Sequence, residues 1–156
     1  MRLSRYLYKR AYKLAISSKL FQKYFEEVIG IDSDIQYLPV YAESLFEDIQ
    51  SECHESGIIN LVFAGNIGEM QSVETIIKAA NELKDFDKIN WHIVGDGSDR
   101  INCEELAIEF GLSNVIFYGQ RPIEDMPAFY QGRNVLLVTL KANKEISITQ
   151  EEGLLP

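Results

Sequence analysis

Four short apolar runs, separated by stretches with helical spacing, constrain the fold of this 156-residue chain more than any other feature. The runs cover residues 58–64, 89–94, 115–118 and 135–140, and a glycine follows each of the first three at once. Short runs rich in β-branched and aromatic residues are typical of strands that are buried on both faces of a sheet. The sequence therefore predicts four buried strands in this region.

The segments between these runs have the spacing of helices. Apolar residues recur at helical intervals after Ser72, which is expected to be an N-cap, and again in a second helix that stops at Gly111. A short third helix covers residues 124–130, with Pro127 in its first turn. Strands joined by helical crossovers run parallel. Residues 58–140 therefore predict an α/β fold, a doubly wound parallel sheet of the Rossmann-like kind.

The first 57 residues are organised differently. They predict a basic helix to about residue 12, a strand at 14–17, a helix at 19–28 and a strand at 35–38. Residues 41–57 are an acidic connector with one helical turn at most. The predicted division is thus 1–40, 41–57 and 58–156.

Charge is spread unevenly along the chain. The formal net charge is −9, but residues 1–30 hold seven Lys or Arg and two Glu, which leaves about −14 for the remainder. An acidic body of this kind is expected to repel nucleic acid. The basic residues alternate with Leu and Tyr, so residues 1–13 fit an anionic membrane surface or an acidic partner. We favour the simpler interpretation, a helix whose apolar stripe packs inward.

The compartment is expected to be the cytoplasm, with peripheral contact at the inner face of the membrane as a further option. No apolar run approaches the roughly 20 residues that cross a bilayer, and the first 17 residues lack a secretory signal. Cys53 and Cys103 match no metal-ligand spacing and are expected to be free thiols.

Three glycine turns follow the first three strands: residues 65–68, 95–98 and 119–121. In an open parallel sheet, such turns gather at the carboxyl edge, where the ligands of doubly wound folds bind. Glycine lets the backbone approach a ligand closely, and a following helix offers unpaired N–H groups to a phosphate. Any one of these glycines is equally explained by a tight turn. The three together favour a nucleotide or another phosphorylated ligand.

Several other functions lose their support in the sequence. The first turn lacks the dinucleotide fingerprint G-x-G-x-x-G, and nothing matches the P-loop G-x-x-x-x-G-K-[ST], which argues against a nicotinamide-dependent oxidoreductase and an NTPase. His54 lies in the acidic connector, and His92 lies inside a strand without a neighbouring nucleophile, so we expect no catalytic triad and a structural role for His92.

The segments FAGNIGEMQSVETIIKAANEL, WHIVGDGSDR and VIFYGQRPIEDMPAFYQGRNVLLVTLK resemble, in this order, the donor-binding domain of GT-B glycosyltransferases of family 4 (group 1). The upstream segments YKLAISSKLFQKYFEE and IQYLPVYAESLFE are similar to the end of that family's acceptor domain and its crossing into the donor domain. By this resemblance, residues 1–40 are a remnant of the acceptor domain, and residues 58–156 are part of a domain that binds a nucleotide sugar.

The resemblance implies a retaining transferase that moves a sugar from a nucleotide diphosphate onto a polysaccharide or glycolipid precursor, without a metal or another cofactor. Many members neutralise the diphosphate with an Arg and a Lys after the first turn, where this chain has residues such as Glu69 and Gln71. The positions expected to contact the donor phosphates are Gly65, Asn66 and Gly68, with Arg100 and Arg121 as helpers. Those expected to shape the nucleotide pocket are Gly95, Asp96, Gly97, Gln120 and Pro122.

The family's E-x7-E element is incomplete in this sequence. Glu145 falls where the first, catalytic glutamate is expected, but Gly153 stands eight positions later. We therefore expect a truncated domain that is inactive by itself. Strand 135–140 is expected to have an unpaired edge that a second copy, forming a homodimer, or the N-terminal segment covers. The alternative function is a non-catalytic α/β interaction module that docks through its basic N-terminal helix.

Overall fold

The computed structural model describes residues 2–31, 34–47, 49, 57–131 and 135–141. The chain forms two compact units, Met1–Ala42 and Glu43–Lys141. Each unit has its own buried core.

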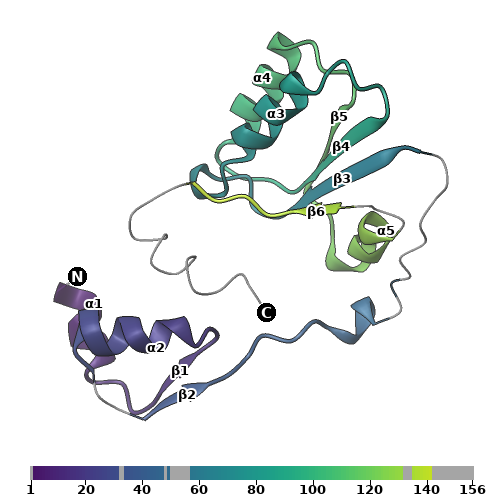
Figure 1. Cartoon of the computed structure of the whole chain (residues 1–156). Helices are drawn as coiled ribbons and strands as arrows, with labels where there is room; N and C mark the ends of the chain where they lie inside the picture. Colours follow the sequence, from purple (N-terminus) through teal and green to yellow (C-terminus); the bar gives the residue numbers. More distant parts are fainter. Residues whose placement is uncertain (1, 32–33, 48, 50–56, 132–134, 142–156) are drawn as a thin grey trace. The chain divides into compact units, whose positions relative to one another are not determined.

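The second unit contains a four-stranded parallel sheet in the order β5-β4-β3-β6. Its strands are β3 (Ile59–Ala64), β4 (Ile89–Val94), β5 (Val115–Gly119) and β6 (Val135–Leu137). Helices α3 (Val73–Glu82) and α4 (Arg100–Glu109) cover one face, and α5 (Met126–Tyr130) lies on the other (Figure 1). The prediction of an α/β, doubly wound parallel sheet is confirmed.

The core of this unit lies between the sheet and the α3–α4 layer. Alternate residues of the central strands point into it, because successive side chains of a strand face opposite sides. Its buried members are Phe63, Ile67, Val73, Ile76, Ile77, Ala80, Trp91, Ile93, Cys103 and Ala107. The helical spacing seen in the sequence after Ser72 thus marks the side of α3 that packs on the sheet.

Strand β6 is shorter than the predicted run 135–140. Beyond Leu137 the chain leaves the ladder and binds the turn η3 (Glu69–Gln71) instead. The Thr139 hydroxyl donates to the Gln71 carbonyl (2.6 Å), and the Lys141 amide donates to the Met70 carbonyl (2.7 Å). Within the described residues, β6 pairs with β3 alone and forms an edge of the sheet. Pairing of this edge with a second copy stays a prediction.

Helix α3 begins where the sequence predicts, but Ser72 does not cap it with its side chain. Ser72 has a left-handed backbone (φ 48°), and its hydroxyl lies 2.9 Å from the Thr75 hydroxyl. The expected hydrogen bond, in which a backbone N–H of the first helical turn donates to the Ser72 side-chain oxygen, is absent.

The first unit pairs two parallel strands, β1 (Leu14–Ile16) and β2 (Ile35–Tyr37). Helix α1 (Arg2–Tyr8) precedes them, and α2 (Leu20–Tyr24) with the π-helical turn η1 (Phe25–Ile29) lies between them. The predicted helix 19–28 is thus an α-helix that widens in its last turn and ends at Gly30, where φ is +67°. Its core consists of Ile16, Phe25, Ile29 and Ile31.

The favoured interpretation of the N-terminal helix was wrong. Leu3, Tyr6 and Leu7 are exposed rather than packed inward. Arg5 and Tyr8 hold α1 in place: the Arg5 Nε donates to the Ile29 carbonyl (2.6 Å), and the Tyr8 ring meets Phe25 edge-on. A side-chain hydrogen bond and one aromatic contact thus set the orientation of α1. The apolar pattern in the sequence does not indicate either contact.

Among the residues that the structure describes, no helix has the length and apolar character needed to cross a membrane.

Cys103 is a free, buried thiol in α4, whereas Cys53 lies outside the described residues. Burial, and then the negative charges of Asp99, Glu74 and Glu104, raise the pKa of Cys103 to about 11.

We expect Cys103 to resist alkylation by iodoacetamide at pH 8 in the folded protein and to react once the protein is unfolded in urea. Peptide mapping by mass spectrometry measures this directly, and rapid labelling of folded Cys103 would contradict it.

The same shift gives a pH dependence of stability. The Cys103 thiol has a higher pKa in the folded state than in the unfolded state, so folding favours its protonated form. The protonated thiol therefore makes its full contribution to the free energy of unfolding below the unfolded pKa of about 9. This contribution is lost as the pH rises from about 9 toward 11.

Candidate functional site

A cavity of about 400 Å³ opens at the carboxyl edge of the sheet in the second unit. The ends of β3 and β4 and the turns after β3, β4 and β5 form most of its wall, and α5 closes one side. Its lining residues are Ala64, Gly65, Asn66, Val94, Gly95, Asp96, Gln120, Arg121, Met126 and Tyr130. The three glycine turns thus meet at one hollow, because parallel strands place their carboxyl ends at the same edge.

The structure separates the predicted site residues into two groups. Six of them line the cavity: Gly65, Asn66, Gly95, Asp96, Gln120 and Arg121. Gly68, Gly97, Arg100 and Pro122 belong to the same turns or follow them but are not part of the lining. Glu145 lies outside the described residues.

The second glycine turn packs against the first. Gly95 has φ +138°, and a Cβ built on it would lie 1.8 Å from the Gly65 carbonyl oxygen. A Cβ on Gly97 would lie 2.4 Å from the Ile67 carbonyl oxygen. These two glycines are therefore needed where one backbone touches another. Gly65 differs, because its Cβ would meet only the Phe63 ring, at 3.6 Å.

Four backbone amides of the first two turns are already paired within the protein. The amides of Gly65, Ile67 and Gly95 donate to the carbonyls of Val94 (3.0 Å), Asp96 (2.8 Å) and Gly119 (2.9 Å), respectively. The amide of Gly97 donates to the Asp96 carboxylate (2.8 Å). In the part of the chain that the structure describes, the amides of Asn66 and Gly68 make no hydrogen bond. The prediction that backbone donors of the first turn bind phosphate therefore depends on these two amides.

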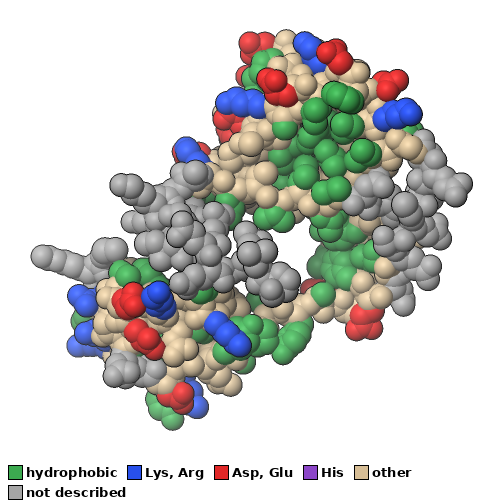
Figure 2. Space-filling view, in the orientation of Figure 1, with side chains coloured by type: hydrophobic (Ala, Val, Ile, Leu, Met, Phe, Trp, Pro, Cys, Tyr) green, Lys and Arg blue, Asp and Glu red, His purple; other side chains and the backbone are tan. Residues whose placement is uncertain are grey.

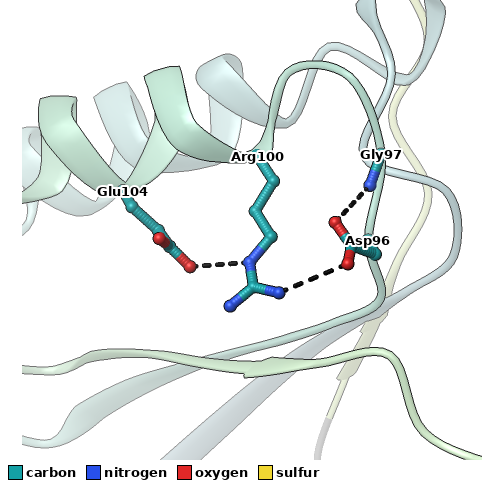
Figure 3. Close-up of polar contacts among 4 residues, drawn as sticks. All are labelled: Asp96, Gly97, Arg100 and Glu104. Atoms are coloured by element: carbon teal, nitrogen blue, oxygen red, sulfur yellow. Dashed lines mark hydrogen bonds and ion pairs between the residues drawn. The ribbon is translucent and has the colours of Figure 1, made fainter.

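Arg100 and Arg121 have different surroundings. Figure 3 shows Arg100 between two carboxylates, with its Nε 2.7 Å from Glu104 Oε1 and its Nη1 3.5 Å from Asp96 Oδ2. The hydrogen bond with Glu104 raises the pKa of Arg100 above its ordinary value. Its charge is therefore balanced inside the protein. Arg121 is exposed and lines the cavity, and it is the one Lys or Arg among the lining residues of this cavity.

Arg100 also supports the third turn. A Cβ on Gly119, where φ is +71°, would lie 3.2 Å from Arg100 Nη1. The guanidinium therefore packs against this turn while it binds Asp96 in the second turn. We conclude that Arg100 holds two walls of the cavity in place rather than facing into it.

The sequence did not indicate the role of Lys141, whose positive charge balances that of Glu69 directly after the first turn. Lys141 Nζ lies 2.5 Å from Glu69 Oε1, although 72 positions separate the two residues. This ion pair raises the pKa of Lys141 above its ordinary value, with the hydrogen bond to Glu69 as the main cause. The pairing of β6 with β3 brings the two residues together, and no spacing in the sequence indicates it.

Four lining residues were not predicted as site residues: Ala64, Val94, Met126 and Tyr130. Ala64 and Val94 are the last residues of β3 and β4. Met126 and Tyr130 belong to the short helix α5, which was predicted, but the apolar pattern of five residues does not say which side faces a cavity. The Tyr130 ring lies 5.8 Å from that of Phe46, so the connector before β3 supports this wall.

His92 lies on the face of the sheet opposite the α3–α4 core and is buried. Its Nδ1 is 2.8 Å from the Tyr118 hydroxyl, and its Nε2 is 3.1 Å from Asn60 Oδ1. Both ring nitrogens are therefore engaged within the sheet, as the expected structural role requires.

The parallel sheet, its helices and the cavity at its carboxyl edge define a doubly wound α/β domain of the kind that binds ligands at this edge. The chain belongs to the family described as glycosyl transferases group 1, whose family model matches residues 47–151. Over 81 residues it is 33% identical to the putative colanic acid biosynthesis glycosyl transferase WcaI of Escherichia coli K12. This match covers 52% of the chain and 20% of that relative, so the chain spans about a fifth of the relative's length.

Solved structures share the fold at low sequence identity. TarM of S. aureus, in complex with Fondaparinux, alpha-GlcNAc-glycerol and UDP, has a TM-score of 0.72 at 11% identity, over 90% of this chain and 28% of that one. HepE of Anabaena, in complex with UDP and glucose, has a TM-score of 0.71 at 15% identity, over 90% of this chain and 41% of that one. The GT-B, Rossmann-like fold implied by the sequence resemblance is confirmed.

Proposed function

We propose that the cavity at the carboxyl edge binds the nucleotide diphosphate of a sugar donor, as part of a glycosyltransferase that builds a polysaccharide or glycolipid. The observation that carries this proposal is the meeting of three glycine turns at one hollow of about 400 Å³. The size suits a small ligand, and the family membership gives the class of reaction. Retention of configuration at the sugar and inactivity of this chain on its own stay predictions from the family resemblance.

The diphosphate is proposed to lie against the first turn and Arg121. The free amides of Asn66, which lines the cavity, and of Gly68 in the same turn offer two donors, and the Arg121 guanidinium, also in the lining, adds a positive charge. Glu69 would repel the diphosphate if it were unpaired, but Lys141 balances its charge. This arrangement replaces the pair of loop cations that many members of the family have.

The nucleoside is proposed to bind toward the third turn and α5. Gln120 supplies polar backbone and side-chain groups there, while Met126 and Tyr130 supply apolar surface. A cavity with apolar walls and a few polar groups is typical of small-molecule sites. UDP is a reasonable first probe, because the Anabaena structure with the same fold contains UDP.

Isothermal titration calorimetry with UDP, GDP and ADP, and with their glucose or mannose conjugates, tests this proposal. We expect Gly65→Leu to weaken binding of the preferred nucleotide on the order of a hundredfold, because the new side chain takes space in the cavity without meeting backbone. Arg121→Gln is expected to weaken binding about tenfold through the loss of a charged hydrogen bond.

Lys84→Gln provides the control, because it removes an exposed positive charge at the opposite edge of the sheet. The affinity of this variant for the nucleotide should equal that of the unchanged protein. If no nucleotide binds the unchanged chain, or if Gly65→Leu binds as well as the unchanged chain, the assignment of this cavity to the donor is wrong. The alternative of a non-catalytic interaction module would then gain support.

A further inference from the structure

A chain of hydrogen bonds crosses the sheet of the second unit on the face that carries α5. The Asn90 Nδ2 donates to Asn60 Oδ1 (3.5 Å), and the same oxygen lies 3.1 Å from His92 Nε2. His92 Nδ1 lies 2.8 Å from the Tyr118 hydroxyl. Strands β3, β4 and β5 thus share one polar network. Among the residues that the structure describes, His92 is the one buried polar or charged side chain.

The chemistry of these groups fixes which of them donates. A carboxamide oxygen only accepts, so in the neutral His92 ring Nε2 carries the proton that Asn60 Oδ1 receives. Nδ1 then has a free lone pair, and the Tyr118 hydroxyl donates to it. The rings of His92 and Tyr118 are also stacked, with centroids 5.7 Å apart and 18° between their planes. His92 thereby sets both the direction of the Tyr118 hydroxyl and the plane of its ring.

Tyr118 connects this network to two walls of the cavity. Its ring meets that of Phe129 in α5 edge-on, with centroids 4.9 Å apart. It also directly precedes Gly119, whose carbonyl accepts from the Gly95 amide of the second turn.

Helix α5 depends on such contacts for its position. A helix of five residues is too short to be stable by itself, so packing against its neighbours decides where it lies. All five of its side chains are of the hydrophobic kind, and they form a green area at the place of this helix in Figure 2. Hydrophobic contacts alone have little directional preference, whereas a fully paired polar network fixes one arrangement.

We propose that His92 and Tyr118 are positioning residues for the nucleoside end of the cavity. Tyr118 holds Phe129, and α5 then places Met126 and Tyr130 in the wall. Neither His92 nor Tyr118 belongs to the lining, so both act through α5 rather than on the ligand. This inference rests on the proposed function of the cavity and adds the residues that decide how well the nucleoside fits.

Tyr118→Phe tests the inference, because it removes one hydroxyl and keeps the ring against Phe129. Calorimetry compares UDP, or whichever of GDP and ADP the unchanged protein prefers, with inorganic pyrophosphate, which lacks the nucleoside. We expect the nucleotide to bind about fivefold more weakly, since one hydrogen bond that orients α5 is lost. Binding of pyrophosphate should not change, because the first turn is unaffected. Phe129→Leu removes the ring contact from the other side and should give the same selective loss.

Tyr12→Phe is the matched control. It removes the same atom from a ring that is 96% exposed and should leave both affinities unchanged. Full nucleotide binding by Tyr118→Phe would overturn this inference and leave the proposed function standing. An equal loss for nucleotide and pyrophosphate would show a general loss of stability and would also overturn it. Absence of nucleotide binding by the unchanged protein would refute the proposed function itself, and this inference with it.

A second measurement needs no nucleotide. His54→Gln leaves His92 as the one histidine of the chain, so nitrogen NMR at pH 8 reports on its ring alone. Nδ1 is expected to resonate as the unprotonated nitrogen, and its signal should move in Tyr118→Phe, where it loses the hydroxyl. A proton on Nδ1, or a signal that Tyr118→Phe leaves in place, would overturn the role of His92.

Discussion

Replacement of Gly95 with alanine is expected to lower the free energy of unfolding of the second unit by at least about 3 kcal/mol. Two effects combine. The backbone at φ +138° is one that residues with a Cβ rarely adopt, and the added Cβ would lie 1.8 Å from the Gly65 carbonyl oxygen. Relief of this overlap forces the first two turns apart and strains the bond from the Gly95 amide to the Gly119 carbonyl. Urea denaturation followed by the fluorescence of Trp91, the single tryptophan, measures the effect.

Gly111→Ala is the matched control. Gly111 also has a positive φ (+67°), but no heavy atom lies within 4 Å of its added Cβ. Its cost should be limited to backbone strain, about 1 kcal/mol. Equal losses for the two variants would show that the contact between the turns contributes nothing, and would contradict our account of Gly95.

Ile67→Ala is expected to cost about 3 kcal/mol of unfolding free energy and to weaken nucleotide binding as well. Ile67 belongs to the first glycine turn, yet its side chain is fully buried in the core of the second unit. Its amide donates to the Asp96 carbonyl, and its carbonyl accepts from the Asp99 amide (2.9 Å). Loss of the side chain leaves a cavity beneath the turn, so Asn66 and Gly68 lose the position from which they are proposed to bind phosphate.

Ile67→Val separates these effects, because it keeps most of the buried volume and should cost about 1 kcal/mol with little change in binding. Denaturation and calorimetry on the same protein samples give both quantities. If Ile67→Ala were as stable as Ile67→Val, the turn would not depend on this side chain, and the link from core to cavity would be refuted.

Strand and helix positions in the second unit could be predicted because each depends mainly on neighbours in sequence. An apolar run followed by glycine indicated β3, β4 and β5, and the spacing after Ser72 indicated the buried side of α3. The parallel order of strands then brought the three glycine turns to one edge, so most of the cavity's lining was foreseen. Met126 and Tyr130 were missed because their orientation depends on how α5 packs.

The roles of individual side chains in the turns were not predictable from spacing. Arg100 and Arg121 look equivalent as cations near glycine turns, yet Glu104 and Asp96 bind the first while the second lines the cavity. Likewise, the amides of Gly65, Ile67 and Gly95 bind carbonyls of neighbouring segments, whereas those of Asn66 and Gly68 make no hydrogen bond within the described residues. These outcomes depend on contacts between segments that are distant in sequence.

The sequence by itself determined the class of fold, the edge of the sheet where the site lies and the family, because these follow from local periodicity, the rules of parallel crossovers and ordered motifs. Only the tertiary structure decided that Gly95 holds two turns together, that Lys141 neutralises Glu69 and that α1 turns its apolar side outward. The physical reason is that each of these depends on a hydrogen bond, an ion pair or a steric contact between residues that only folding brings within a few ångströms.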